Sequence, residues 1–374
     1  MTSTILIAAF SGRSLAQSAR RAGYVPLVAD AFGDLDTRAA AHDVRVIGGA
    51  MQTGFRAKPL LAALNELIAA APSKPIGLVL GSGFEDKPRL VDLLDQRYGV
   101  IGCGVEALTA CKDPKIFFPV LDELGIAHPE TRMTPPDNCE GWITKRIGGS
   151  GGRHIRDCTA TSRAKPRRYF QKRIEGTRIS VSAIVADGIA TDMTRQWCSP
   201  APGQPYQYGG AVSVPYSDTP DQLQMLMAVD QLARGLELRG LVSFDFIVAN
   251  GTAYLLEINP RPGASLDVID TVEGSRFHAH VAACRDGKLD QWGGSSTGLA
   301  KAAAILHAGR GALTLGQIDW PDWSADRGAP GTHVPAGAPL ATVFGEAETP
   351  DAAVALARAR LAELESLIYE STKS

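Results

Sequence analysis

The first hundred residues alternate short apolar runs with stretches of helical spacing, and this alternation constrains the fold more than any other feature of the sequence. Four short apolar runs are predicted as strands: residues 5–8, 25–29, 44–47 and 77–80. Between them, residues 13–22 and 60–70 carry apolar side chains at helical spacing. Strands that alternate with helices form an open parallel sheet with helices on both faces. We therefore expect the chain to begin with an α/β domain of this kind.

Length and charge limit the class of protein. The chain has 374 residues, of which 45% are hydrophobic and 21% are charged, as in an ordinary globular protein of two to three structural units. Its formal net charge of −2 gives no general electrostatic reason for a nucleic-acid or membrane partner. The N-terminus lacks the basic start and cleavage site of a signal peptide, and no apolar run is long enough to span a bilayer. We expect a cytoplasmic protein.

The six cysteines do not form a recognisable metal or redox motif. No two of them have CxxC spacing, which argues against a zinc knuckle or a redox dithiol. Without an export signal, reduced thiols are the simplest expectation, with each cysteine a small buried apolar residue. These cysteines are at positions 103, 111, 139, 158, 198 and 284.

The most informative motif is a predicted hairpin near residue 250. Two apolar runs, 241–249 and 253–258, are joined by Asn250 and Gly251, a pair typical of tight hairpin turns. Side chains alternate along a strand, so Glu257 and Asn259 are expected on one face, and pairing can bring Asp245 beside Glu257.

Two carboxylates and an amide oxygen on one sheet face suit Mg²⁺, which prefers hard oxygen ligands. A buried carboxylate pair without a cation would repel itself. The alternative is a solvated face with ordinary ion pairs, but the neighbouring apolar residues favour a covered sheet face. Asp245, Glu257 and Asn259 are therefore the predicted metal ligands.

A second motif combines a lysine with a glycine-rich loop. The predicted strand 142–147 contains Lys145 and leads into Gly148-Gly149-Ser150-Gly151-Gly152. Glycine-rich turns can wrap phosphates with backbone N–H groups while a lysine supplies positive charge. The order differs from that of a P-loop, in which the lysine follows the glycines. Taken alone, such a loop is usually only a flexible connection.

Two further segments are candidate binding segments only because of where they lie in the sequence. Lys115 lies on a predicted helix over residues 113–124, where a solvated surface lysine is the ordinary alternative. The predicted strand 169–174, with Gln171, Lys172 and Ile174, has the character of an edge that could bind an adenine or could simply be an edge strand.

These four signals, in this order, resemble the ATP-grasp superfamily, and the segment from Leu256 to Pro262, LEINPRP, is the most specific part of the resemblance. The resemblance covers roughly residues 1–270. It implies the ATP-grasp fold: an N-terminal open parallel α/β domain, two α+β ATP-grasp subdomains and a small C-terminal β unit. The corresponding boundaries are 1–110, 111–300 and 301–374, the last with a terminal helix.

The resemblance also implies roles for individual residues. Lys115 and Lys145 would hold ATP phosphates together with Gly149, Ser150 and Gly151. Gln171, Lys172 and Ile174 would contact adenine, and Arg261 would stabilise the acyl phosphate or the transferring phosphoryl group. Many members carry an acid at the position of Gln171 and another for the ribose near Arg178, so Glu175 is the expected substitute for the ribose contact.

Two segments resemble narrower branches. Residues 330–344 are similar to the small terminal β subdomain of biotin-carboxylase-like ligases, and residues 81–85 are similar to a branch of predicted ATP-dependent carboligases. Members of that branch occur beside genes for one-carbon coenzymes. This implies amide formation in methanofuran-type or pterin coenzyme assembly, with a glutamate and an aromatic amine as typical reactants.

The expected function is an ATP- and Mg²⁺-dependent ligase that joins a small carboxylate to an amine through an acyl phosphate. A bicarbonate-using carboxylase is the nearest alternative. An oxidoreductase or an ATP-sensing regulator are alternatives of another class, although the turn at residues 10–15 lacks dinucleotide-binding glycine spacing. The oligomeric state is open, with a homodimer among the options.

Candidate residues for the acceptor substrate are few, and a plain surface loop explains them equally well. They are Glu85, Arg153, His154, Tyr206, Tyr208, Gly209 and Gly210.

Overall fold

The N-terminal domain is a four-stranded parallel sheet, as the sequence predicts. The computed structural model describes residues 3–271, 275–289 and 298–371. The sheet order is β3-β2-β1-β4, and β1 pairs in parallel with both β2 and β4. The strands are β1 (Thr4–Ala8), β2 (Val25–Asp30), β3 (Asp43–Val46) and β4 (Leu78–Leu80).

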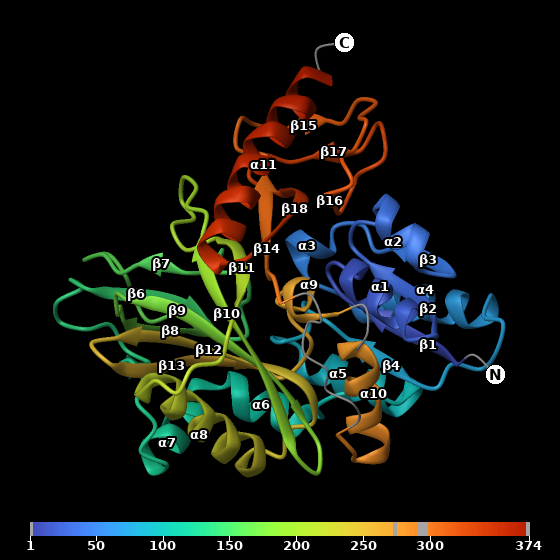
Figure 1. Ribbon diagram of the computed structural model, residues 1–374. Coiled ribbons are helices and arrows are strands. Elements are labelled where there is room, and N and C mark those ends of the chain that lie inside the picture. The colour runs from blue at the N-terminus through green and yellow to red at the C-terminus, as the bar shows by residue number, and fades with distance from the viewer. Residues whose placement is uncertain (1–2, 272–274, 290–297, 372–374) are drawn as a thin grey trace.

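Helices cover this sheet because their apolar stripes match its buried strands. Leu60, Leu64 and Leu67 of α4 are completely buried beneath the sheet, at the spacing expected for one helix face. The helices are α1 (Arg13–Arg21), α2 (Leu35–Ala40), α3 (Ala50–Thr53), α4 (Ala57–Ala69) and α5 (Pro88–Tyr98). The domain lies at the right of Figure 1, in blue.

Two short helices lead to a second, small sheet. The helix α6 (Val105–Lys112) ends two residues before Pro114, where α7 (Pro114–Glu123) begins. The side chain of Asp113, between them, caps α7. The small sheet that follows has the order β5-β8-β6-β7 and is called the lid sheet below. Its strands are β5 (Thr131–Arg132), β6 (Trp142–Arg146), β7 (Arg156–Asp157) and β8 (Arg168–Lys172).

The largest sheet has eight strands in the order β13-β12-β9-β10-β11-β14-β18-β16. It begins with the predicted hairpin at one edge. The strands up to this hairpin are β9 (Thr177–Val185), β10 (Ile189–Cys198), β11 (Tyr208–Val214), β12 (Gly240–Ala249) and β13 (Thr252–Asn259). The helices on and beside it are α8 (Pro220–Gly235), α9 (Leu266–Ile269) and α10 (Arg276–Asp286).

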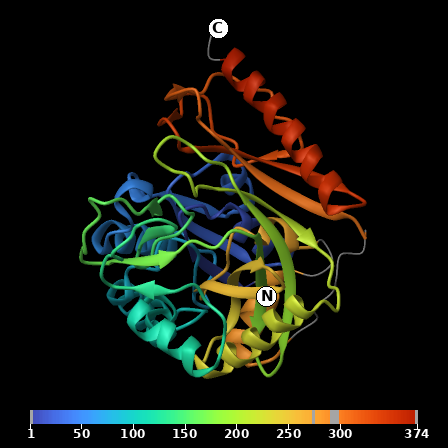
Figure 2. The ribbon, with the colours of Figure 1, turned by 90° about the vertical axis from the view of Figure 1, so that its left-hand side faces the viewer.

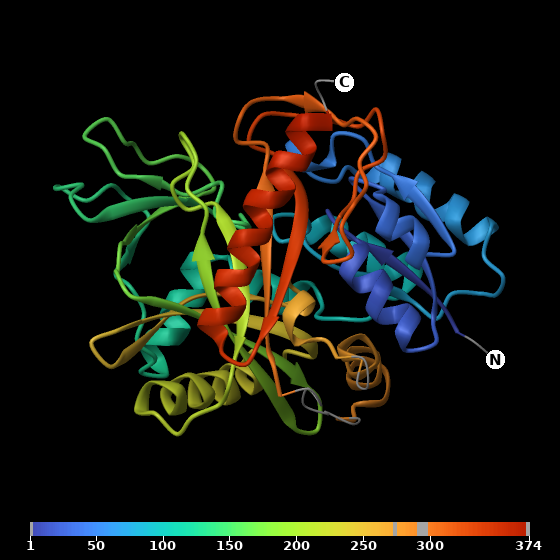
Figure 3. The same cartoon turned by 45° about the horizontal axis from the view of Figure 1, so that its top comes forward.

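The C-terminal segment extends this same sheet and adds a long helix. β14 (Ala300–His307) pairs with β11, and β18 (Pro339–Ala347) pairs with β14. The helix α11 (Pro350–Ser371) runs along β18 and β14. It lies in the upper part of Figure 1, at the outer edge in Figure 2 and at the front centre of Figure 3. The short strands are β15 (Leu313–Thr314), β16 (Ser324–Ala325) and β17 (His333–Val334). The predicted β unit is therefore present as strands continuous with the central sheet.

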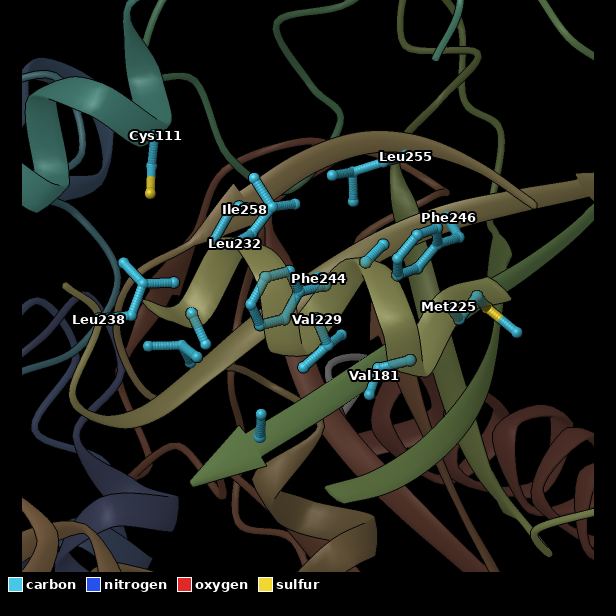
Figure 4. Close-up of a cluster of buried hydrophobic side chains, with 14 of the residues drawn as sticks. Cys111, Val181, Met225, Val229, Leu232, Leu238, Phe244, Phe246, Leu255 and Ile258 are labelled. Carbon is cyan, nitrogen blue, oxygen red and sulfur yellow. The ribbon is translucent and has the colours of Figure 1, made fainter. Parts of the chain in front are cut away.

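A core between α8 and the hairpin fixes the position of the acidic residues. Val229 and Leu232 of α8 pack with Phe244 of β12 and with Leu255 and Ile258 of β13, as Figure 4 shows. All five side chains are almost completely buried. Because these apolar side chains occupy one face of the hairpin, the residues that alternate with them face the other way.

The expectation that all six cysteines are free thiols was wrong for one pair. Cys139 and Cys158 form a disulfide, with their Cα atoms 5.2 Å apart. The pairing of β6 with β7 brings the two positions together, since Cys139 precedes β6 and Cys158 follows β7. Among the described residues, no helix is long and apolar enough to cross a membrane.

Candidate active site

The hairpin has the turn and the register that place two carboxylates side by side. Asn250 and Gly251 both have positive φ, 51° and 75°, as a tight two-residue turn requires. Asp245 pairs directly with Glu257, and Ser243 pairs with Asn259. An irregularity lies between Asp245 and Phe246, which pairs with Leu255 and leaves Leu256 as the extra residue of a bulge.

Asp245, Glu257 and Asn259 therefore lie on one face of the sheet. The amide nitrogen of Asn259 donates a hydrogen bond to Asp245 Oδ2 at 3.0 Å. Burial and the neighbouring Glu257 raise the pKa of Asp245. Burial also acts to raise the pKa of Glu257, but Lys112 and Lys145 outweigh it and hold that pKa below its usual range. Two carboxylates that share surrounding cations separate in pKa in this way.

Lys112 supplies the cation at this cluster. Its amine donates to Asn259 Oδ1 at 2.8 Å and lies 3.7 Å from Glu257 Oε2. It is the last residue of α6 and is 9% exposed. Lys115, predicted for this position, lies in the exposed first turn of α7. The sequence CKDPK offers both lysines, and only the helix break at Asp113 and Pro114 decides which one reaches the hairpin.

Lys145 reaches the same cluster from the lid sheet. Lys145 lies in β6 and is 4% exposed. Its amine donates to Gln171 Oε1 at 3.4 Å. Its direct neighbour across the strands is Tyr169. Burial would lower the pKa of Lys145, but Tyr169 and Glu257 more than offset this, so the pKa is raised and the amine stays charged.

The glycine-rich loop packs against three different parts of the chain. A methyl group on Gly148 would meet the backbone of Glu85 and Asp86, and one on Gly149 would overlap the ring of His154. The backbone N–H of Tyr208 donates to the carbonyl of Gly151 at 3.1 Å. The loop therefore needs glycines because of close contacts as well as positive φ at Gly148 and Gly151. Ser150 lies between these glycines in the same loop.

His154 lies beneath this loop in a neutral state. Burial lowers its pKa to about 4, and its Nδ1 has no hydrogen-bond partner in the described part of the chain. Sequence reasoning placed His154 only among candidate acceptor residues. The structure brings it close enough to Glu257 and Lys145 for the charges of these two residues to act on the pKa of His154.

Arg261 connects the hairpin to the N-terminal domain. Its Nε and Nη2 bind Glu85 Oε1 at 2.8 and 2.6 Å, and the backbone N–H of Gly83 donates to the other oxygen of Glu85. Glu85 is 4% exposed. Burial would raise its pKa, but Arg261 and Lys112 lower it, so Glu85 is charged. The acidic residue thus holds Arg261 at the end of β13.

The predicted adenine strand is only partly enclosed. Gln171 is 1% exposed and donates from Nε2 to Thr131 Oγ1 at 3.1 Å. Lys172 is exposed and Ile174 is half-buried. Glu175, expected at the ribose, is exposed and pairs with Arg173 at 3.0 Å.

The candidate acceptor residues do not gather at one point. Tyr206 donates to Asp157 in the lid sheet at 2.6 Å, whereas Tyr208 is largely covered and burial raises its pKa. Gly209 and Gly210 belong to β11 and pack against Trp197. Of these four residues, Tyr206 and Tyr208 contact the glycine-rich loop through their backbone, at Gly152 and Gly151. Arg153 donates from Nε to Gln204 Oε1 at 2.6 Å.

The donor set at the hairpin fits magnesium. It offers two carboxylates and one amide oxygen, which are hard ligands, and lacks the sulfur or imidazole donors preferred by softer ions. In the described ranges, no cluster of three His, Cys, Asp or Glu residues provides a rival site. Asp245, Glu257 and Asn259 would hold the ion, with phosphate oxygens completing its shell.

Comparison with known proteins agrees with this geometry. Residues 111–265 match the ATP-grasp domain family described as ATP-grasp_3. This segment is similar to ATP-grasp domains. The N-terminal parallel sheet, the lid sheet and the antiparallel central sheet confirm the predicted ATP-grasp fold. The general prediction of an enzyme of the ATP-grasp ligase type is also confirmed.

The individual proteins that this chain is similar to are distant in sequence. The carbamoyl phosphate synthase large chain of Myxococcus xanthus is 25% identical over 244 residues, which span 58% of this chain and 22% of that protein. An L-amino acid ligase from Bacillus licheniformis has a TM-score of 0.68 at 12% identity, covering 97% of both chains. The biotin carboxylase domain of Hydrogenobacter thermophilus 2-oxoglutarate carboxylase, solved with MgADP and bicarbonate, has a TM-score of 0.68 at 12% identity and covers 92% of this chain and 86% of that one.

Proposed function

We propose that this protein is an ATP- and magnesium-dependent ligase that activates a small carboxylic acid as an acyl phosphate and passes the acyl group to an amine. The single observation that carries the proposal is the meeting of Asp245, Glu257 and Asn259 with Lys112 from one side and Lys145 from the other. Acids that could hold Mg²⁺ and lysines that could hold phosphates face each other across the two sheets.

The chemistry follows from where these charges lie. A carboxylate oxygen of the substrate attacks the γ-phosphorus of ATP, and ADP leaves. Lys112 and Lys145 offset the charge of the phosphates, which is the main catalytic task in phosphoryl transfer. A magnesium ion held by Asp245, Glu257 and Asn259 would offset further negative charge on the phosphates. Arg261, fixed by Glu85, stabilises the acyl phosphate on the N-terminal side.

The second step is attack by the amine on the acyl carbon, which releases phosphate and forms an amide. Water competes with the amine, so the intermediate must be shielded. The glycine-rich loop, with Gly149, Ser150 and Gly151, supports this role because Gly148 and Gly149 line the small cavity beside Lys112 and Glu257. Gln171, Lys172 and Ile174 are the proposed adenine contacts, with Glu175 at the ribose after a local change of its side chain.

Nucleotide entry requires the two sheets to separate. The cavity lined by Lys112, Arg146, Tyr169 and Glu257 measures about 20 Å³, enough for a single water. A nucleotide needs several hundred cubic ångströms. The lid sheet therefore moves away from the hairpin before ATP binds and returns afterwards.

A bicarbonate-using carboxylase is the second candidate. The similarity to a biotin carboxylase domain and the extension of the central sheet by β14 and β18 support it. The similarity to an L-amino acid ligase supports the amide-forming reaction equally. Three further hypotheses rank below these two: a role in coenzyme assembly for the amide-forming reaction, an oxidoreductase, and an ATP-sensing regulator.

A coupled assay of ADP release tests these candidates together. Purified protein is given MgATP and a panel of carboxylic acids against a panel of amines, with bicarbonate as a separate arm. The ligase predicts ADP release that requires both an acid and an amine. Release that requires bicarbonate and no other acid identifies the carboxylase, and NADH binding without ATP binding would overturn both.

A further inference from the structure

The lid sheet carries a concentration of positive charge that ATP binding does not require. Residues 145–178 contain eleven lysines and arginines and two acids, a net charge of +9, whereas the whole chain has a formal charge of −2. The predicted phosphate ligand accounts for only one of these cations, Lys145. The remaining charge calls for another negatively charged group.

Two of these cations, together with Lys87 of the N-terminal domain, converge on one acid, Asp86. Arg167 Nη2 lies 3.1 Å from Asp86 Oδ2, Arg146 Nη2 lies 3.9 Å from it, and Lys87 Nζ lies 3.7 Å from Oδ1. The side chains of Arg146 and Arg167 are 53% and 57% exposed. A single carboxylate leaves this group, called the junction cluster below, with a surplus of two positive charges.

The cations behind the junction cluster add to the surplus. Arg146 pairs directly across the strands with Arg168, a like-charged arrangement that is destabilising by itself. Arg168 donates to Thr144 Oγ1 and to the carbonyl of His154, both at 3.0 Å, and Arg156 donates only to backbone carbonyls. Within residues 3–271, 275–289 and 298–371, neither Arg156 nor Arg168 has an acidic side chain in ion-pair range. Burial, Arg156 and Arg146 together lower the pKa of Arg168.

The junction cluster lies where a substrate would approach the reacting phosphate. Asp86 and Lys87 follow β4, at the carboxyl end of the parallel sheet, the edge at which open α/β sheets bind ligands. Gly148 of the glycine-rich loop packs against Asp86. Arg146 also lines the small cavity beside Glu257 and Lys112, so the cluster and the proposed phosphate site share a wall.

We infer that the acid activated by this protein carries a second anionic group, a carboxylate or a phosphate, which Arg146, Arg167 and Lys87 bind. The inference rests on the proposed function, because it assigns the cluster to the acid substrate of that reaction. The substrate's reacting carboxylate points toward Lys112 and Lys145, and its second anion displaces Asp86 as the partner of the two arginines. Asp86 keeps the arginines ordered before the substrate arrives.

Trapping with hydroxylamine tests this without knowledge of the natural amine. Hydroxylamine converts an acyl phosphate to a hydroxamate, which is measured colorimetrically. Butyrate, glutarate, glutamate and 3-phosphonopropionate are compared at fixed MgATP. We expect a KM at least tenfold lower for the acids with two anionic groups than for butyrate. The KM values of glutarate and 3-phosphonopropionate then show whether the second group is better bound as a carboxylate or as a phosphate-like anion.

Variants separate the cluster from the nucleotide site. R167Q, alone and with K87Q, should raise the KM for glutarate five- to thirtyfold while kcat and the KM for MgATP change less than twofold. R358Q, on the exposed side of α11 and far from the cluster in the chain, is the matched charge control and should change nothing. A rise in the KM for MgATP instead would overturn the inference, as would equal use of butyrate and glutarate.

A binding measurement covers the case in which no acid is activated. Calorimetric titration of glutarate into protein with MgADP should give binding that R167Q weakens at least fivefold. If that binding is present but no hydroxamate forms from any acid, the proposed reaction fails and the anion site stands. If MgATP-dependent hydroxamate forms but R167Q changes no constant for any dianionic acid, the anion site fails and the reaction stands.

Discussion

The amine of Lys112 lies 2.8 Å from Oδ1 of Asn259, so the last residue of a helix and the last residue of a hairpin strand meet across 147 positions of sequence. The same amine is 3.7 Å from Glu257. One cation thereby touches two of the three proposed metal ligands. Because of this position, Lys112 rather than Lys115 is the lysine of α6 and α7 that we propose for the phosphate contact.

The two lysines can be compared directly. Lys112→Met should lower kcat for MgATP-dependent ADP release by on the order of 100-fold, because it removes a preorganised positive charge where phosphate charge develops. Lys115→Met, three residues away and exposed, should change kcat less than twofold. The reverse pattern in a coupled ADP assay would remove Lys112 from the site.

The carboxylate pair predicts opposite effects on activity and stability. Asp245→Asn removes the repulsion between Asp245 and Glu257, so the melting temperature should stay the same or rise. Turnover should fall on the order of 100-fold because a metal ligand is weakened. Differential scanning fluorimetry and ADP release measure the two effects. A variant that loses stability and activity together would point to a structural role only.

Metal removal gives an independent check on the same residues. EDTA should abolish ADP release by the wild-type protein, and excess Mg²⁺ should restore it. Glu257→Gln should require a higher Mg²⁺ concentration for half-maximal activity, if any activity remains. Turnover in EDTA equal to that in Mg²⁺ would exclude the proposed site.

Local patterns were enough to predict the hairpin and its acids, because the turn, the alternation and the pairing all act within 15 residues. They also predicted the parallel sheet from its apolar runs. They could not select Lys112 over Lys115, since that depends on a helix break at Pro114 and a contact 147 residues away. The pairing of Cys139 with Cys158 likewise depends on the fold of the lid sheet, and CxxC spacing is no guide to it.

Adjacent glycines of the loop offer a matched pair of variants. Gly151 and Gly152 both have positive φ, 68° and 73°, so alanine strains the backbone equally at each, by roughly 1–2 kcal/mol. A methyl group at Gly152 would overlap the carbonyl oxygen of Tyr206, whereas one at Gly151 meets nothing within 4 Å. Gly152→Ala should therefore lower kcat at least tenfold more than Gly151→Ala.

Limited proteolysis tests the contact between the glycine-rich loop and Tyr206 without measuring enzyme activity. In Gly152→Ala the loop cannot rest on residue 206, so trypsin should cut faster after Arg153 or Arg156 than it does in Gly151→Ala. Equal cleavage rates together with equal kcat values would show that the contact with Tyr206 does not hold the loop.

A buried histidine predicts the acid limit of stability. His280 accepts a hydrogen bond from the N–H of Leu241 at 2.8 Å and binds the carbonyl of Ile101 at 2.9 Å. Burial lowers its pKa to about 4, below the ordinary 6.5 that the unfolded chain has. The unfolded state therefore takes up the proton first as pH falls, and stability is constant above pH 6.5 and lost between pH 6.5 and 4.

The expected loss is about 1.4 kcal/mol per pH unit for each such histidine. His154 and His307 have pKa values lowered to about 4 by burial and act with the same sign. His280→Asn keeps an acceptor for Leu241, so its melting temperature should fall less between pH 7 and pH 5 than that of the wild type. Parallel curves for the two proteins would contradict this assignment.

The pairing of β14 with β11 has a consequence for dissecting the chain. A protein truncated before residue 300 would leave the backbone N–H and C=O groups of Gly210, Ala211 and Val212 without their strand partners. An unprotected strand edge of this kind invites other chains to add to it. The final seventy-five residues therefore protect an edge of the sheet that carries Asp245 and Glu257. Fragments that lack these residues should aggregate and precipitate rather than fold as a smaller enzyme.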